Sequence, residues 1–268
     1  MTEYFDMVHN GIPIKDVELI DVHAHLGPAY NFHTAKCTAE DMVWMMDRCG
    51  IDKTILSTVL GINGDIVIGN NMMLEAIKTH RGRLYGACTV NGNYPELSLE
   101  ELHRCFEADK DVLIMKNHPV ETKCRVNSRN LKKIYEFASE RKLFVVTHTW
   151  LDGDPYGNQD NFAGVVKEYP DIKWFMGHSL GPYGGRKAVE IAQESSNVYL
   201  DITMSMCPAR QIEFFVSEVG SERVLMGTDN PYIDPRPHVG RVALAEITHE
   251  ERVNIFGKNA RRLINFKD

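Results

Sequence analysis

The sequence contains histidines and carboxylates whose spacing is suited to binding a metal ion. His23 and His25 lie in the segment DVHAH, two residues apart. In an extended strand, side chains two residues apart project to the same side, so both imidazoles can bind one cation. His148 and Asp229, much later in the chain, would complete a set of three nitrogens and one carboxylate. Such a set suits Zn²⁺ and leaves a position for water, which the ion activates at neutral pH.

The elements that must bring these residues together are short apolar runs alternating with longer amphipathic stretches. This pattern predicts strands alternating with helices. The eight predicted strands are Glu18–His23, Lys53–Thr58, Leu84–Cys88, Asp111–Lys116, Leu143–His148, Ile172–His178, Asn197–Ile202 and Glu222–Thr228. Helical crossovers return the chain in the same direction, so the sheet should be parallel, and eight units close into a (β/α)8 TIM barrel. The alternative is an open doubly wound sheet, but no glycine-rich phosphate-binding turn follows the first strand.

The helical patterns fill the intervals between these strands. Thr38 is a predicted N-cap for a helix to Cys49, Ser128 for a helix to Arg141, and Phe162–Tyr169 should end before Pro170. The other predicted helices are Asn71–His80, Leu99–Ala108, Gly185–Glu194, Pro208–Val219 and Glu250–Phe256. We predict a lead-in segment over residues 1–17 and one metal-dependent catalytic barrel over residues 18–268.

The carboxyl ends of barrel strands share one rim, where active sites lie. Lys116-Asn117-His118 ends the fourth predicted strand, His148 the fifth and His178 the sixth, while Asp201 lies on the seventh and Asp229 follows the eighth. A single histidine at a strand end is more often structural, and an H-x-H pair alone is a weak signal. The prediction depends on ligand types meeting at several strand ends, because burying such groups without a metal or partners is costly.

Composition excludes several other classes of protein. A net charge of −7 disfavours non-specific binding to nucleic acid. Six cysteines without a C-x-x-C pair indicate reduced thiols in a cytoplasmic protein. The first 16 residues lack the apolar region of a signal peptide, and no apolar run approaches the roughly 20 residues that span a bilayer. We therefore expect a small-molecule substrate and neither a nucleic-acid nor a membrane partner; a homo-oligomer is compatible with the sequence.

Several segments together resemble the amidohydrolase superfamily, in particular its amidohydrolase-2 group. They are DVHAHLG, MKNHP, FVVTH, WFMGHSLG, NVYLDI and VLMGTDNPY, and the closing IFGKNARRLINF is similar to the terminal helix of that group. The resemblance extends from Glu18 to Phe266. The group includes metal-dependent hydrolases and aromatic-acid decarboxylases of TIM-barrel fold, so the resemblance implies one or two divalent ions, most simply zinc.

The resemblance also implies roles for individual residues. His23 and His25 match the H-x-H ligands, and His148 matches the ligand on the fifth strand. His178 matches a histidine that binds the second metal in binuclear members and is catalytic in mononuclear ones. Asp229 matches a metal ligand that accepts the proton of the attacking water.

Cationic and aromatic residues near the predicted rim are candidates for substrate binding. Lys116 falls where binuclear members carry a carboxylated bridging lysine; unmodified, it would instead bind a substrate anion. Arg186, Arg210 and Arg236 follow strands six, seven and eight, where each would hold a carboxylate or remain a solvated surface charge. Trp150 would wall a substrate pocket or pack its own loop.

The leading functional hypothesis is a hydrolase. In it, metal-activated water attacks an amide, lactone or ester carbonyl of a small, carboxylate-bearing substrate, Asp229 accepts the proton and His178 positions the carbonyl. The alternative is a decarboxylase of an aromatic or enoic acid, in which His178 or Asp229 transfers the proton. A third hypothesis is an inactive barrel that only binds a ligand, against which the intact metal positions argue.

Overall fold

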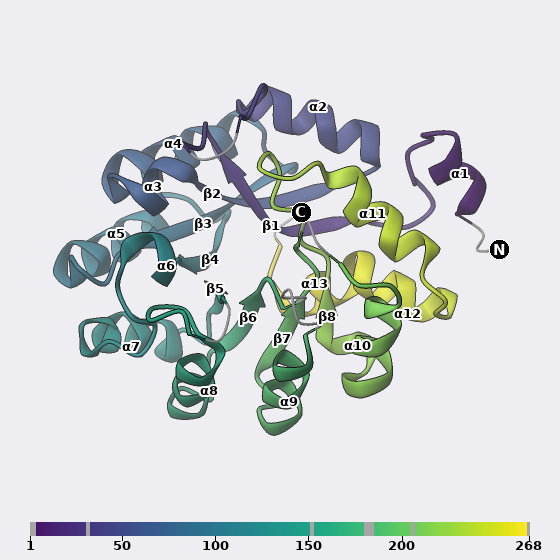
Figure 1. Cartoon of the computed structure of the whole chain (residues 1–268). Coiled ribbons are helices and arrows are strands. Elements are labelled where there is room, and N and C mark those ends of the chain that lie inside the picture. The colour runs from purple at the N-terminus through teal and green to yellow at the C-terminus, as the bar shows by residue number, and fades with distance from the viewer. Residues whose placement is uncertain (1–3, 31–32, 151–152, 180–184, 205–206, 267–268) are drawn as a thin grey trace.

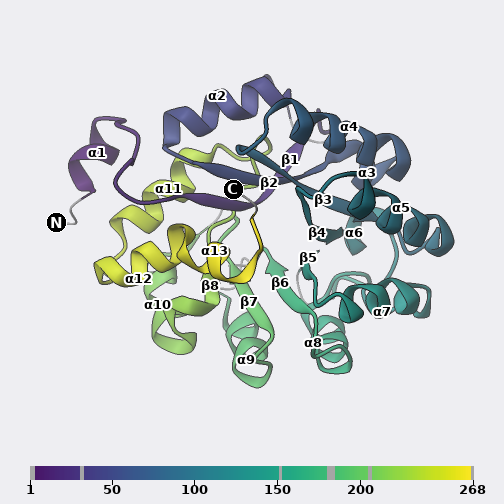
Figure 2. The same ribbon diagram turned by 180° about the vertical axis from the view of Figure 1, so that it is seen from behind.

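The computed structural model describes residues 4–30, 33–150, 153–179, 185–204 and 207–266. The first three residues of the predicted lead-in segment, and part of the segment WFMGHSLG, lie outside these ranges. Eight strands form one sheet in chain order, and each neighbouring pair from β1–β2 to β7–β8 is parallel. They are β1 (Ile20–Leu26), β2 (Lys53–Thr58), β3 (Leu84–Val90), β4 (Val112–Asn117), β5 (Phe144–His148), β6 (Lys173–Gly177), β7 (Val198–Asp201) and β8 (Val224–Leu225). Helices surround the strands in both views of the molecule (Figure 1, Figure 2), which confirms the predicted TIM barrel and excludes the open sheet.

The barrel closes along the seam between β1 and the chain that follows β8. Val22 N–H donates to the Met226 carbonyl at 3.0 Å, Asp229 N–H to the His23 carbonyl at 2.8 Å, and His25 N–H to the Asn230 carbonyl at 2.7 Å. These bonds explain why β1 continues past the predicted end at His23. They also explain why the regular part of β8 is short, since the chain beyond Leu225 bends along β1 to satisfy its backbone groups.

The helices lie mostly where the sequence predicts them. They are α1 (Phe5–His9), α2 (Ala39–Cys49), α3 (Val59–Asn63), α4 (Ile66–Thr79), α5 (Pro95–Ala108), α6 (Pro119–Thr122), α7 (Lys132–Glu140), α8 (Gln159–Glu168), α9 (Arg186–Glu194), α10 (Gln211–Val219), α11 (Pro235–Leu244), α12 (His249–Val253) and α13 (Asn259–Leu263), with 3₁₀ turns η1 (Arg129–Leu131) and η2 (Ser221–Arg223) and a π turn η3 (Asn254–Lys258). Thr38 caps α2 in a complete capping box, as predicted. None of the described helices is long and apolar enough to cross a membrane.

Some helices begin earlier than predicted, or were not predicted at all. α4 begins five residues before the predicted Asn71, because the Asp65 side chain accepts the Val67 and Ile68 amides and caps the helix there. The sequence pattern does not predict α11, in which Pro235 occupies the first turn, a position that proline tolerates. It also does not predict α1, α3 and α6, which have five residues or fewer.

Two apolar clusters stabilise the barrel. The larger one packs the helices against the outside of the sheet. The smaller one fills the interior of the barrel and includes Ile20, Val22, Phe144 and Phe175 together with Phe266 from the C-terminal segment. Each large side chain removed from water there contributes roughly 1.5–3 kcal/mol. The C-terminal segment thus closes the amino end of the barrel (Figure 2), which leaves the carboxyl rim for the polar residues.

Candidate metal centre

The two histidines of β1 present the same ring nitrogen to one carboxylate. His23 Nδ1 is 2.8 Å from Asp201 Oδ2, and His25 Nδ1 is 3.0 Å from Ser57 Oγ. These bonds leave both Nε2 atoms for other contacts: they lie 3.8 Å (His23) and 2.9 Å (His25) from Asp229 Oδ1. Both imidazoles are only 2% exposed. The alternation of side chains in β1 therefore directs both nitrogens to one point, as the H-x-H spacing predicts.

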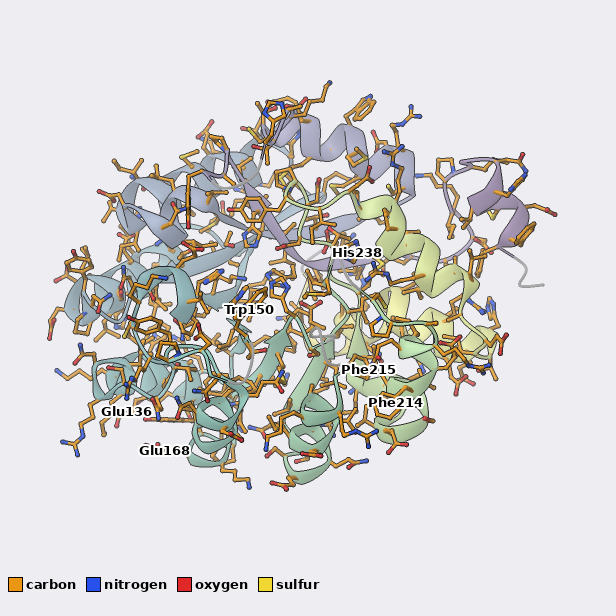
Figure 3. The ribbon with its side chains drawn as sticks, viewed as in Figure 1. Glu136, Trp150, Glu168, Phe214, Phe215 and His238 are labelled. Atoms are coloured by element: carbon orange, nitrogen blue, oxygen red, sulfur yellow. The ribbon has the colours of Figure 1, made fainter. Side chains whose placement is uncertain are left out.

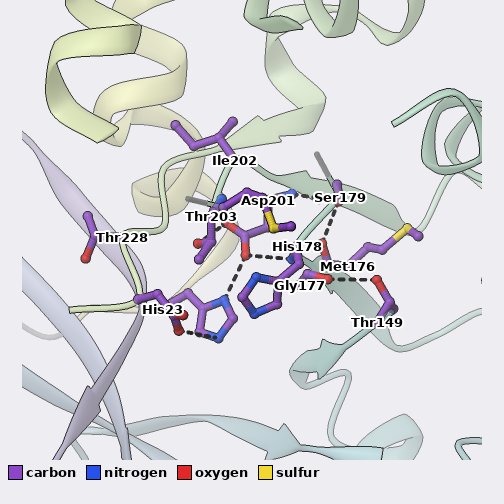
Figure 4. A network of polar contacts seen from close by, with 12 residues as sticks. His23, Thr149, Met176, Gly177, His178, Ser179, Asp201, Ile202, Thr203 and Thr228 are labelled. Carbon is purple, nitrogen blue, oxygen red and sulfur yellow. Dashed lines mark hydrogen bonds and ion pairs between the residues drawn. The ribbon is translucent and has the colours of Figure 1, made fainter. Parts of the chain in front are cut away.

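Asp201, at the end of β7, hydrogen-bonds His23 and the backbone of His178 (Figure 4). Its Oδ2 accepts from His23 Nδ1 and, at 3.2 Å, from the backbone N–H of His178; its Oδ1 accepts from the Thr203 hydroxyl and amide. Burial by itself would raise the pKa of Asp201, but the hydrogen bond from His23 and the nearby imidazoles lower it below its usual range. A carboxylate on Nδ1 fixes the histidine tautomer and makes Nε2 a better metal ligand.

Asp229 and His178 reach the centre from strained backbone positions. Their φ angles are +63° and +61°, in the left-handed region that non-glycine residues rarely adopt. Such strain persists only where the surrounding structure imposes it, and it concentrates at functional sites. Gly227 lets the chain approach this closely, because a Cβ there would lie 2.3 Å from Thr203 Oγ1 and 2.4 Å from Asp201 Oδ1.

His23, His178 and Asp229 form a group that fits a metal ion. One ligand atom from each lies within 4.8 Å of the other two, and all three residues are buried. His178 Nδ1 is buried with no hydrogen-bond partner among the described residues, which is costly unless something binds it. Two imidazoles and a carboxylate, with His25 beside them, are donors suited to Zn²⁺ and to related divalent ions.

His148 lies at the edge of this group. Its ring centroid is 4.3 Å from that of His178, and its ring stacks on His118 at 3.9 Å and on Trp150 at 5.4 Å. The structure therefore brings His148 to the rim, as predicted, but outside the group of three whose ligand atoms lie closest together.

Lys116, at the end of β4, lies inside the centre. Its ammonium donates to His23 Nε2 at 2.6 Å, the nitrogen assigned to the metal. Burial lowers the pKa of Lys116 to about 8, although Asp229 and Asp201 partly oppose the shift. A cation and a neighbouring ammonium cannot both bind His23 Nε2. Metal binding through this nitrogen therefore requires Lys116 to move or to lose its charge.

The histidines of the centre are neutral at physiological pH. Burial, followed by the positive charge of Lys116, lowers the pKa of His23 to about 3. Burial also lowers the pKa values of His25, His118, His148 and His178. Asp229 is ionised: burial alone would raise its pKa, but the bond from His25 and the other imidazoles bring it well below its usual range. Neutral imidazoles and a carboxylate are the protonation states that bind a metal.

A cavity of about 280 Å³ opens onto this centre. Trp150 and Tyr232 contribute aromatic walls to the cavity. Figure 3 shows Trp150 within the ring of helices. Glu136 and Glu168, in contrast, lie on the surrounding helices α7 and α8. The lining residues are His25, Ile62, Asn63, His118, Glu121, His148, Trp150, His178, Met204, Asp229, Tyr232 and Ile233.

The three arginines predicted near the rim do not line the cavity. Arg210 is exposed and pairs with Glu246, and Arg236 is exposed and pairs with Asp234. Arg186 is exposed at the start of α9. Each follows a rim strand in sequence, but the structure places its side chain on the exposed surface. Among the described lining residues there is no lysine or arginine, so a substrate carboxylate would not meet a guanidinium here.

Three residues of this site were not among the functional residues predicted from the sequence. His118 follows β4 and lines the cavity, Asp201 orients His23, and Ser57 on β2 orients His25. Strand ends indicated His118 and Asp201. Nothing indicated Ser57, because a serine in a predicted strand is common and its partner is set by the register between β1 and β2.

The chain belongs to the amidohydrolase family, whose model matches residues 20–266. No curated protein matches this chain. It is similar in structure to a TIM-barrel protein from Bordetella bronchiseptica, with 15% identity, a TM-score of 0.74, and 92% of this chain and 98% of that one covered. It is also similar to 5-carboxyvanillate decarboxylase from Sphingomonas paucimobilis, with 14% identity, a TM-score of 0.72, and 92% and 99% covered. A third similar structure is a dihydroxybenzoic acid decarboxylase from Polaromonas sp. JS666 with bound manganese and 2-nitroresorcinol, with 17% identity, a TM-score of 0.72, and 92% and 96% covered.

Proposed function

We propose that this protein is a metal-dependent decarboxylase of a small aromatic acid. The observation that carries the proposal is the buried group of His23, His178 and Asp229 at the base of a cavity with aromatic walls. The volume of about 280 Å³ suits a ligand with one ring, and Trp150 and Tyr232 offer flat surfaces against which a ring packs.

Two of the similar structures support this choice over the hydrolase hypothesis. They are decarboxylases of hydroxylated benzoic acids, and one of them holds manganese. We propose Zn²⁺ as the ion here because of the nitrogen-rich donor set, with Mn²⁺ as the second choice.

In the reaction, the bond between the ring carbon and the carboxyl carbon breaks. Carbon dioxide leaves, and the electron pair remains on the ring carbon, which then takes a proton. A bound divalent ion would hold the substrate oxygens and stabilise negative charge on them. His178 or Asp229 delivers the proton, since both lie at the base of the cavity. Because Asp229 is ionised and His178 is neutral in the resting protein, whichever of them acts must first take a proton from water or from a substrate hydroxyl.

The second candidate is hydrolysis of a small lactone, amide or ester. Asp229 and His178 support it, because an ionised carboxylate can accept a proton from water while the unpartnered His178 Nδ1 contacts the carbonyl group. The two reactions share their residues, so only the products separate them.

The test is a product assay on protein loaded with Zn²⁺ or Mn²⁺. Hydroxybenzoic acids are screened for release of carbon dioxide, and aromatic lactones and esters for release of acid. Carbon dioxide release that disappears in the His23→Ala/His25→Ala variant would support the proposal. Hydrolysis without carbon dioxide release would reject it in favour of the second candidate.

A further inference from the structure

His118 has no role in the chemistry above, yet it lines the cavity beside His148. It follows β4 and is the N-cap residue of α6, the four-residue helix at the rim. It is 8% exposed, and its ring stacks on His148 with centroids 3.9 Å apart and planes 18° apart. The stacking against His148 and the hydrogen bond that His118 Nδ1 accepts from the Glu121 amide together hold the ring in one orientation.

The cap determines which nitrogen of His118 carries the proton. The backbone N–H of Glu121 donates to His118 Nδ1 at 3.3 Å. A nitrogen that accepts a hydrogen bond has a free lone pair, so a neutral ring must carry its proton on Nε2. His118 Nε2 has no hydrogen-bond partner among the described residues. It is also not among the atoms that are both buried and without a partner, so this nitrogen is accessible. The Nε2–H group is therefore open to the cavity.

The cavity needs such a donor. Its described lining contains no lysine or arginine, and two of its members, Glu121 and Asp229, are acidic. A carboxylate entering it meets no lysine or arginine side chain among the described lining residues, so neutral groups such as the Asn63 amide and the His118 ring would have to supply its hydrogen bonds. An oriented N–H beside the site is the kind of group that fixes a ligand without adding charge.

We propose that His118 is a substrate-binding residue whose Nε2–H donates to a carboxylate oxygen of the substrate. The backbone of α6 thus sets the specificity of the site, because the Glu121 amide makes the histidine a donor. The inference rests on the proposed function only in taking the cavity as the place where the substrate binds.

The matched variant is His118→Asn. Asparagine is a strong N-cap residue, so it preserves the start of α6, but its shorter side chain does not extend as far into the cavity. The probes are 2,6-dihydroxybenzoate and resorcinol, the same ring without the carboxylate, and binding to Zn²⁺-loaded protein is measured by calorimetry. His103→Ala, an exposed histidine on α5, is the control.

We expect His118→Asn to weaken 2,6-dihydroxybenzoate binding by about tenfold or more, the scale of a hydrogen bond to a charged group. Resorcinol binding should change by less than about twofold. In the free wild-type protein, nitrogen NMR of the His118 ring should show the proton on Nε2.

Each other outcome has a distinct meaning. Wild-type affinity in His118→Asn would show that the residue only caps α6 and would overturn the inference. An equal loss for both probes, or a proton on Nδ1, would overturn it as well. If both probes fail to bind the wild type, the inference and the proposed function fall together. If the acid binds and depends on His118 but no carbon dioxide is released, the inference stands and the decarboxylase proposal fails.

Discussion

Replacing Asp201 with asparagine tests whether the carboxylate that binds His23 Nδ1 prepares this histidine for a metal. Asp201 accepts four hydrogen bonds: two on Oδ2, from His23 and His178, and two on Oδ1, from Thr203. An asparagine amide has only one oxygen, so its NH₂ group must face two donors on one side. The Thr203 hydroxyl can turn to accept, and His23 Nδ1 can accept if its proton moves to Nε2, but the backbone N–H groups of His178 and Thr203 can only donate.

The magnitude follows from the bonds lost. At least one hydrogen bond to a charged acceptor disappears, worth about 1.5–3 kcal/mol, and an unmatched donor is left buried. We therefore expect the free energy of unfolding of metal-free protein to fall by roughly 2–4 kcal/mol. Loss of such an orienting partner typically weakens metal binding by about 10–100-fold, and we expect a decrease in that range.

The assays are urea denaturation without metal and competition for Zn²⁺ against a chromophoric chelator. Thr203→Val is the matched control, because it removes one bond to Oδ1 and leaves the His23 contact intact. We expect it to lower stability while changing metal affinity by less than about threefold. Equal metal affinity in Asp201→Asn and wild type would refute the argument, and so would equal losses of affinity in the two variants.

Three further predictions follow. At saturating metal, where His23, His25 and Asp229 remain to hold the ion, His178→Asn should lower turnover by about 10²-fold on whichever substrate the product assay identifies; unchanged turnover would leave His178 a structural role. Lys116→Met should retain metal, because a free ammonium competes with the ion at His23 Nε2; metal loss, together with a bicarbonate requirement in the wild type, would show instead that Lys116 is carboxylated. Acid should destabilise the metal-free protein, because the His23 pKa is lowered from 6.5 to about 3, so the unfolded chain binds the proton first as pH falls. The stability associated with His23 is present above pH 6.5 and is lost progressively between pH 6.5 and 3, which urea denaturation across that window measures; a His23→Gln variant with the same pH dependence would contradict it.

The sequence determined much of the architecture. Alternating short and long patterns predicted all eight strands, and β2 has the bounds that were predicted. The sequence also indicated that His23 and His25 face one way, because side-chain alternation is a local property of an extended chain. Helix starts were less predictable where a cap decided them, as Asp65 does for α4.

Other features depend on contacts between residues that are distant in the chain. Ser57 meets His25 across the register of β1 and β2, and Asp201 meets His23 across 178 positions of sequence. The local pattern around each residue is that of an ordinary buried strand, so no periodicity reveals the pairing. The same applies to Arg236, which sequence placed near the rim and the structure turns outward to Asp234.

The sequence by itself determined which ligand types stand at strand ends and that a barrel would gather them, since both follow from periodicity and residue chemistry. Only the tertiary structure decided how they meet: Lys116 against His23 Nε2, and the strained backbone of His178 and Asp229. These depend on closing the seam between β1 and the end of the eighth unit. That closure fixes distances of a few ångströms, which local preferences along the chain do not set.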